Sequence, residues 1–91
     1  MKELTIIIGG GLDTYCINCR KTKDIVKKVI ETKYLDLQVN YEHINVSRPE
    51  SIKKYGHMHP PCIIIDDTIV HEGSIPTESM VEKILNHFLD D

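Results

Sequence analysis

The hydrophobic pattern begins with a short, mostly β-branched run, Leu4–Ile8, which ends at Gly9. Its length and the glycines after it are typical of a buried strand, which we expect near the centre of a sheet. The next segment predicts an amphipathic helix from about Ile17 to Lys33 that covers one side of that sheet, with lysines on its outer face. Four apolar residues follow the helical period there: Ile25, Val26, Val29 and Ile30.

The segment after this helix alternates between apolar and polar residues. Leu37, Val39 and Tyr41 set the alternation, and after a change of phase Ile44 and Val46 continue it. We interpret the segment as a second strand and the change of phase as a bulge. A strand, a crossover helix and another strand with these spacings predict a right-handed unit whose strands are parallel.

A short helix and a hairpin are predicted next. Ser47 is a suitable cap for a short helix that ends at Gly56. Two apolar runs, Cys62–Ile65 and Thr68–Val70, flank the pair Asp66-Asp67, which favours an antiparallel hairpin. Because the pair contains no glycine, the type of turn stays open.

The last helix begins at Pro76–Glu78, and the apolar residues that follow share one stripe: Val81, Ile84, Leu85 and Phe88. The predicted order is therefore β-α-β-α-β-β-α. This is an α/β fold with a four-stranded mixed sheet and helices on both faces. With 91 residues and no linker or break in composition, the chain is expected to form one domain over residues 1–91.

Composition and charge exclude several classes of function. The net charge of -3 argues against a nucleic-acid partner, which requires a basic surface that displaces counterions. Basic residues do cluster between Arg20 and Lys28, and we interpret them as a solvated helix face. No apolar run approaches the ~20 residues needed to cross a bilayer, and the first residues do not resemble a secretory signal. We therefore expect no membrane partner and a cytoplasmic protein.

Three consecutive glycines, Gly9 to Gly11, follow the first strand. They lack the spacing of a dinucleotide fingerprint, and no lysine of a phosphate-binding loop follows them. Phosphate binding is therefore disfavoured. We interpret the glycines as a flexible turn that leads to Cys16.

Cys16 and Cys19 stand at the predicted start of the long helix. Positions i and i+3 of a helix lie on one face, roughly 5 to 6 Å apart, which suits a disulfide. The helix N-terminus, with Arg20 and Lys21 nearby, favours the thiolate of Cys16 and makes it the candidate nucleophile. Cys19, one turn inside the helix, is expected to be less exposed and suited to resolving a mixed disulfide.

The same cysteine spacing also occurs in metal sites. A structural zinc site usually has a second pair of ligands, for which the candidates are His57, His59 and Cys62. The alternative hypothesis is a metal-binding or trafficking domain that uses Cys16 and Cys19 with Cys62 or His59. Cys62 itself has two interpretations, a small buried hydrophobe or a third thiol close to the other two.

Several segments resemble the small thioredoxin/glutaredoxin-like redox-active disulfide proteins of archaea and bacteria. They are "CINC" after the first strand, "YGHMHPPCIIIDDTIVHEGSIP" from Tyr55 to Pro76, and the amphipathic helix after it. The resemblance covers nearly the whole chain and implies a thioredoxin-like fold. It also implies a cis peptide bond before Pro61, packed against the dithiol. The backbone of the preceding residue, Pro60, would then be available to pair with an extended substrate.

The chain departs from that family pattern at three places. Ile17 replaces the usual proline after the first cysteine, which leaves the reduction potential open. Pro60 has no N–H group, which weakens or alters substrate pairing there. The loop Gly10–Tyr15 is longer than expected, and within it Tyr15 is a candidate substrate contact, although an aromatic there is more often simply packed. Asp13 is either a proton acceptor for the thiols or, more simply, a solvated carboxylate.

The leading hypothesis is a thiol-disulfide oxidoreductase in which Cys16 and Cys19 are catalytic. Pro60, Pro61 and Tyr15 are the expected substrate contacts, with no metal and no organic cofactor. The expected partners are a disulfide-containing protein or small-thiol substrate and an unidentified reductant. A third possibility is an interaction module whose dithiol is only a sensor or a structural remnant.

Overall fold

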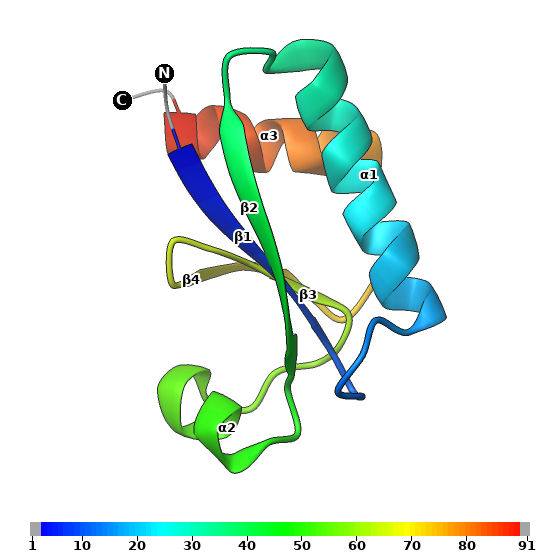
Figure 1. Cartoon of the computed structure of the whole chain (residues 1–91), viewed down its shortest axis with the longest axis vertical. Helices are drawn as coiled ribbons and strands as arrows, with labels where there is room; N and C mark the ends of the chain where they lie inside the picture. The colour runs from blue at the N-terminus through cyan, green and yellow to red at the C-terminus, as the bar shows by residue number, and fades with distance from the viewer. Residues whose placement is uncertain (1–2, 90–91) are drawn as a thin grey trace.

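Four strands form one mixed sheet in the order β2-β1-β3-β4 (Figure 1). In this computed structural model, which describes residues 3–89, β1 lies inside the sheet, parallel to β2 and antiparallel to β3. β4 completes the predicted hairpin with β3. The strand bounds are β1 (Glu3–Gly10), β2 (Gln38–Asn45), β3 (Cys62–Ile65) and β4 (Thr68–Glu72).

Three helices cover the two faces of this sheet. α1 (Ile17–Lys33) and α3 (Glu78–Leu89) pack together on one face, and α2 (Pro49–Tyr55) lies apart from them (Figure 1). The core is correspondingly divided into two clusters of buried residues, one on each face. The element order and the fold class expected from the sequence are confirmed.

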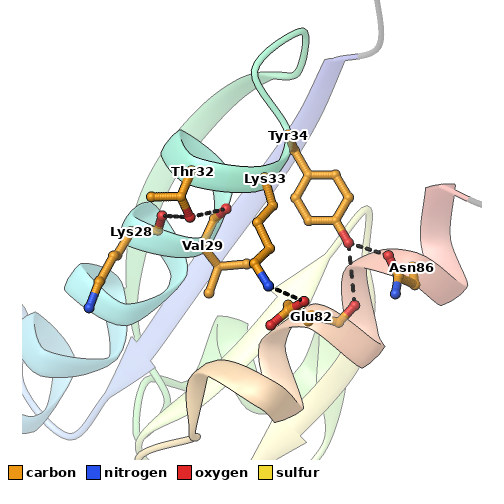
Figure 2. A network of polar contacts seen from close by, with 7 residues as sticks. All are labelled: Lys28, Val29, Thr32, Lys33, Tyr34, Glu82 and Asn86. Atoms are coloured by element: carbon orange, nitrogen blue, oxygen red, sulfur yellow. Dashed lines mark hydrogen bonds and ion pairs between the residues drawn. The ribbon is translucent and has the colours of Figure 1, made fainter.

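The C-terminal end of α1 is joined to α3 by polar contacts (Figure 2). Lys33 Nζ lies 2.8 Å from a carboxylate oxygen of Glu82, and the Tyr34 hydroxyl contacts the Asn86 side chain. Exposed ion pairs contribute little stability, so the buried apolar stripes of the two helices provide most of the attachment.

The hairpin turn between β3 and β4 is now defined. Asp66 and Asp67 both have positive φ angles, 47° and 67°. Two successive left-handed residues are the signature of a type I′ turn, which aspartate tolerates better than most residues. The Asp66 carboxylate also accepts a hydrogen bond from the Thr5 N–H at 3.3 Å, which ties the turn to β1.

The prediction of a bulge in the second strand, β2, is wrong. β2 pairs with β1 without interruption, and the irregular register lies instead between Ile63 and Ile64 on the hairpin side of the sheet. The change of phase in β2 has another cause: Tyr41 packs with the α1 face, whereas Ile44 packs in the core cluster of the opposite face. The buried side of this edge strand therefore switches along its length.

The prediction that Ser47 caps the short helix, α2, is also wrong. The residue at the N-cap of α2 is Arg48, which makes no capping hydrogen bond with its side chain, and Pro49 begins the helix. Ser47 is engaged differently, because its N–H donates to the Asn45 side chain at 2.9 Å. The helix still ends at Gly56, which has a positive φ of 82°. Within residues 3–89, no helix is long and apolar enough to cross a membrane.

Candidate active site: a dithiol at a helix N-terminus

Cys16 occupies the N-cap position of α1. Its backbone is extended, with φ -84° and ψ 177°, and its sulfur accepts a hydrogen bond from the Cys19 N–H at 3.2 Å. A cap side chain normally offers an oxygen to these unpaired N–H groups, and here a sulfur does so. The helix therefore begins with a thiol as its capping group.

The two sulfurs of Cys16 and Cys19 face each other. They lie 2.7 Å apart; Cys16 is partly exposed, and Cys19 is buried. This proximity is compatible with a disulfide between the two residues. The arrangement also matches the expected division into an accessible first thiol and a protected second one.

The pKa values of the two thiols are shifted in opposite directions. A hydrogen bond from the Cys19 thiol is the largest cause that lowers the pKa of Cys16, and backbone N–H groups of the helix N-terminus add to it. Burial is the largest cause that raises the pKa of Cys19. Hydrogen bonds, rather than the cations Arg20 and Lys21 suggested by the sequence, therefore make the main contribution at Cys16.

We expect Cys16 to be the first thiol alkylated when the reduced protein is treated with iodoacetamide between pH 7 and 10. Because the pKa of Cys16 is lowered, its alkylation rate should reach half its maximum at a pH below 9.0, the ordinary pKa of a cysteine thiol. Cys62 should react last, since burial raises its pKa to about 11. Mass spectrometry of peptides from timed samples measures each rate, and faster labelling of Cys19 or Cys62 would contradict this order.

The glycines have a different role from a flexible turn. Gly9 and Gly10 are the last residues of β1, and a Cβ atom on Gly10 would lie only 2.3 Å from the Cys19 sulfur. Gly10 is therefore needed for the close approach of α1 to the sheet. Gly11 alone has open space around it and belongs to the exposed loop.

The Pro60-Pro61 peptide bond is cis, as the resemblance implied. Pro61 is buried and Pro60 exposed. Gly9 pairs with Cys62 in the sheet, so Pro61 lies one residue before that pair, at the end of β1 where Gly10 approaches the Cys19 sulfur. The neighbouring carbonyl groups of His59 and Pro61 both accept from the Gly73 N–H, at 2.8 and 3.1 Å.

Cys62 is separated from the dithiol by the sheet. Its sulfur lies in the core cluster of the α2 face, 3.9 Å from the Met58 sulfur, whereas Cys19 belongs to the cluster of the α1 face. The interpretation as a small buried hydrophobe describes it correctly. The interpretation as a third exchanging thiol is not supported. Side chains of successive positions along a strand alternate between its faces, and that of Cys62 points away from the dithiol.

The alternative set of metal ligands is not brought together. Among residues 3–89, no group of three or more histidine, cysteine, aspartate or glutamate side chains is placed to hold a metal ion. Cys62 faces away from the dithiol, and His59 is an exposed residue whose N–H donates to Glu72 at 2.9 Å. Geometry therefore gives no support to the metal-binding hypothesis in this part of the chain.

The loop before α1 is held by an ion pair that sequence reasoning missed. The Asp13 carboxylate accepts from the Arg48 guanidinium and, at 2.9 Å, from the Asn45 amide. Hydrogen bonds from Arg48 and Asn45 lower the pKa of Asp13 to about 2. The carboxylate thus stays ionised near neutral pH, which makes it a structural anchor rather than a proton acceptor for the thiols.

A shallow hollow of about 600 Å³ lies beside Cys16. Two large apolar side chains at its rim are well exposed, Leu12 at 58% and Ile17 at 73%. Tyr15 is half-buried, with its ring 4.6 Å from the His43 ring and with Lys23 Nζ 4.8 Å above it. The residues lining the hollow are Leu12, Tyr15, Cys16, Ile17, Asn18 and Arg20.

Comparison with known proteins identifies the family of this chain. The family model described as "Thioredoxin domain" matches residues 5–86. A thioredoxin of Methanocaldococcus jannaschii is 30% identical over 77 residues, which are 85% of this chain and 84% of that protein.

Two solved structures share the fold at low sequence identity. A Staphylococcus aureus protein of unknown function superimposes with a TM-score of 0.65 at 17% identity, covering 98% of this chain and 94% of its own. A malarial protein superimposes with a TM-score of 0.57 at 12% identity, covering 94% and 97%. Sequence match, fold and the helix-capping dithiol agree, and the chain belongs to the thioredoxin domain family.

Proposed function

We propose that the protein is a thiol-disulfide oxidoreductase in which Cys16 attacks the substrate disulfide and Cys19 resolves the intermediate. The observation that supports it most directly is the pair of facing sulfurs, 2.7 Å apart, of which one is partly exposed and the other buried. The family membership supports a redox role in general terms.

The reaction balances with the two cysteines alone. The Cys16 thiolate attacks one sulfur of the substrate disulfide, forms a mixed disulfide and releases the other sulfur as a thiolate. Cys19 then attacks the Cys16 sulfur, forms the internal disulfide and releases the second substrate thiolate. Two electrons pass from the dithiol to the substrate, and an external reductant of unidentified nature restores the dithiol. No metal or organic cofactor is required.

The substrate class we favour is a disulfide in a polypeptide with apolar neighbours. Leu12 and Ile17 offer exposed apolar surface beside the reactive sulfur, and Tyr15 lines the same hollow. Pro60 is exposed but does not line the hollow beside Cys16, and because it has no N–H an extended substrate would receive no hydrogen bond from it. Side-chain contacts at the rim would therefore carry more of the recognition than backbone pairing at Pro60.

The test is reduction of insulin disulfides with dithiothreitol as electron donor, followed by mapping of the oxidised protein. We expect turnover well above the dithiothreitol background and a single disulfide, between Cys16 and Cys19. The matched control is Cys62→Ala, which removes a thiol from the opposite face of the sheet and should retain full turnover. Precipitation of the insulin B chain and peptide mass spectrometry are the two measurements.

Two outcomes would contradict the proposal. A Cys16–Cys19 disulfide that forms without any reduction of insulin or of a small disulfide reagent would instead indicate a sensor or a structural remnant. Loss of turnover in a folded Cys62→Ala variant would show that the third thiol takes part, against its position across the sheet.

A further inference from the structure

His43 lies on β2, on the same face of the sheet as Tyr41 and therefore toward α1. Its Nε2 atom is buried and is the one such side-chain nitrogen or oxygen without a hydrogen-bond partner among residues 3–89. Buried polar atoms normally have a partner, because leaving one unpaired costs free energy. An unpaired nitrogen at this place therefore calls for a functional explanation.

The other ring nitrogen has a partner. A hydrogen bond joins the His43 ring to the backbone of Asp13, and since Nε2 is unpaired, this bond comes from Nδ1. A carbonyl accepts only from a protonated nitrogen, so the neutral ring carries its proton on Nδ1. Nε2 is then left with a free electron pair, which makes it a proton acceptor.

This free nitrogen lies close to the dithiol. The position of a Cβ atom on Gly10 would be 3.2 Å from His43 Nε2, 2.3 Å from the Cys19 sulfur and 3.7 Å from the Cys16 sulfur. The nitrogen and both sulfurs therefore gather around one residue of β1. Their proximity follows from the absence of a side chain at Gly10.

We propose that His43 Nε2 accepts the proton of the Cys19 thiol when Cys19 resolves the mixed disulfide. This inference rests on the proposed oxidoreductase function. In the reduced protein, Cys16 accepts the hydrogen bond of the Cys19 thiol. Once Cys16 is bonded to a substrate sulfur, that acceptor is lost, and the buried Cys19 needs another base to become a thiolate.

The step balances without further reactants. The proton moves from Cys19 to His43 Nε2, the Cys19 sulfur bonds to the Cys16 sulfur, and the substrate sulfur leaves as a thiolate. The imidazolium then returns its proton to the departing thiolate or to water. The next catalytic cycle begins with His43 neutral again.

The groups around the ring set its charge. Burial is the largest cause that lowers the pKa of His43, and Asp13, from the loop before α1, partly opposes it. The Tyr15 ring contacts the His43 ring at a tilt from the same loop, the two cysteines approach from the start of α1, and Lys23 lies above the Tyr15 ring. With its pKa lowered, His43 is neutral at pH 7 and acts as a base; below that pKa it is protonated, and resolution should slow.

The experiment separates the two thiol steps with 5,5′-dithiobis(2-nitrobenzoate), in a Cys62→Ala background so that two thiols remain. The first equivalent of coloured thiolate reports attack by Cys16, and the second reports resolution by Cys19. We expect His43→Asn to slow the second phase about 10-fold or more at pH 7 and to leave the first unchanged. The variant keeps an amide donor for Asp13 but has no basic nitrogen, so the acid limb of the second phase should disappear.

An unchanged second phase in folded His43→Asn, or equal slowing of both phases, would overturn the proposal. If the variant does not fold, the native protein decides: the acid midpoint of its second phase must match the ring titration of His43 measured by NMR, and a mismatch overturns it. Failure of the proposed function is distinguishable by the insulin assay: the native protein would then reduce no insulin, although its accessible Cys16 thiol would still release coloured thiolate from the reagent.

Discussion

Cys16→Ser is expected to reduce insulin-reducing activity to the dithiothreitol background, because a serine hydroxyl cannot form the mixed disulfide that starts the reaction. The fold should persist, since Cys16 is the N-cap of α1 and serine is among the best N-cap residues. Insulin turnover and the thermal midpoint of unfolding, measured on the same preparation, separate loss of chemistry from loss of structure. Residual turnover in the folded variant would contradict the assignment of the nucleophile.

Cys19→Ser is the companion variant and distinguishes the two thiols. With the resolving thiol removed, Cys16 should remain bonded to the substrate, and a stable mixed disulfide should accumulate. Non-reducing gels and mass spectrometry identify the adduct and the cysteine that carries it. An adduct on Cys62, or none at all, would be incompatible with the proposed roles.

Gly9→Ala is expected to destabilise the protein strongly. The new Cβ atom would lie 2.3 Å from the Cys62 sulfur and 2.8 Å from a methyl carbon of Val46, inside a closely packed core. Overpacking of this kind costs about 1–3 kcal/mol, and two such contacts place Gly9 at the upper end of that range. Urea unfolding followed by circular dichroism measures the loss.

Gly11→Ala is the matched control, because nothing lies within 4 Å of its added Cβ atom. Its free energy of unfolding should change by less than about 0.5 kcal/mol. Adding Cys62→Ala to Gly9→Ala should recover part of the loss, since it removes the nearer of the two clashing atoms. Equal stability of the two glycine variants would refute the packing explanation.

Most of the fold could be predicted from the sequence because its hydrophobic residues recur with clear strand and helix periods. The apolar run Leu4–Ile8 is buried at the centre of the sheet, and the helix over 17–33 begins and ends where its pattern indicates. The type I′ turn could not be predicted, because aspartate reaches positive φ less readily than glycine or asparagine. The supposed bulge reflects a limit of one-dimensional patterns: a strand whose buried face changes looks the same as one with an extra residue.

The candidate site was only partly predictable. Local spacing identified Cys16 and Cys19, because both lie within one turn of one helix. His43 stands on a different strand and has no local motif, and its approach to the sulfurs depends on the parallel pairing of β1 and β2. Cys62 was uncertain for a similar reason, since proximity to Pro61 in sequence does not reveal the face of the sheet that a side chain occupies.

The position of Cys62 across the sheet bears on the fidelity of the proposed redox cycle. Three cysteines allow three different disulfide pairings, and two of these would be dead ends. β1, with Gly9 against one sulfur and Gly10 against another, keeps Cys62 on the far side from both partners. Repeated oxidation should therefore yield one disulfide isomer, between Cys16 and Cys19, without mispaired forms that involve Cys62.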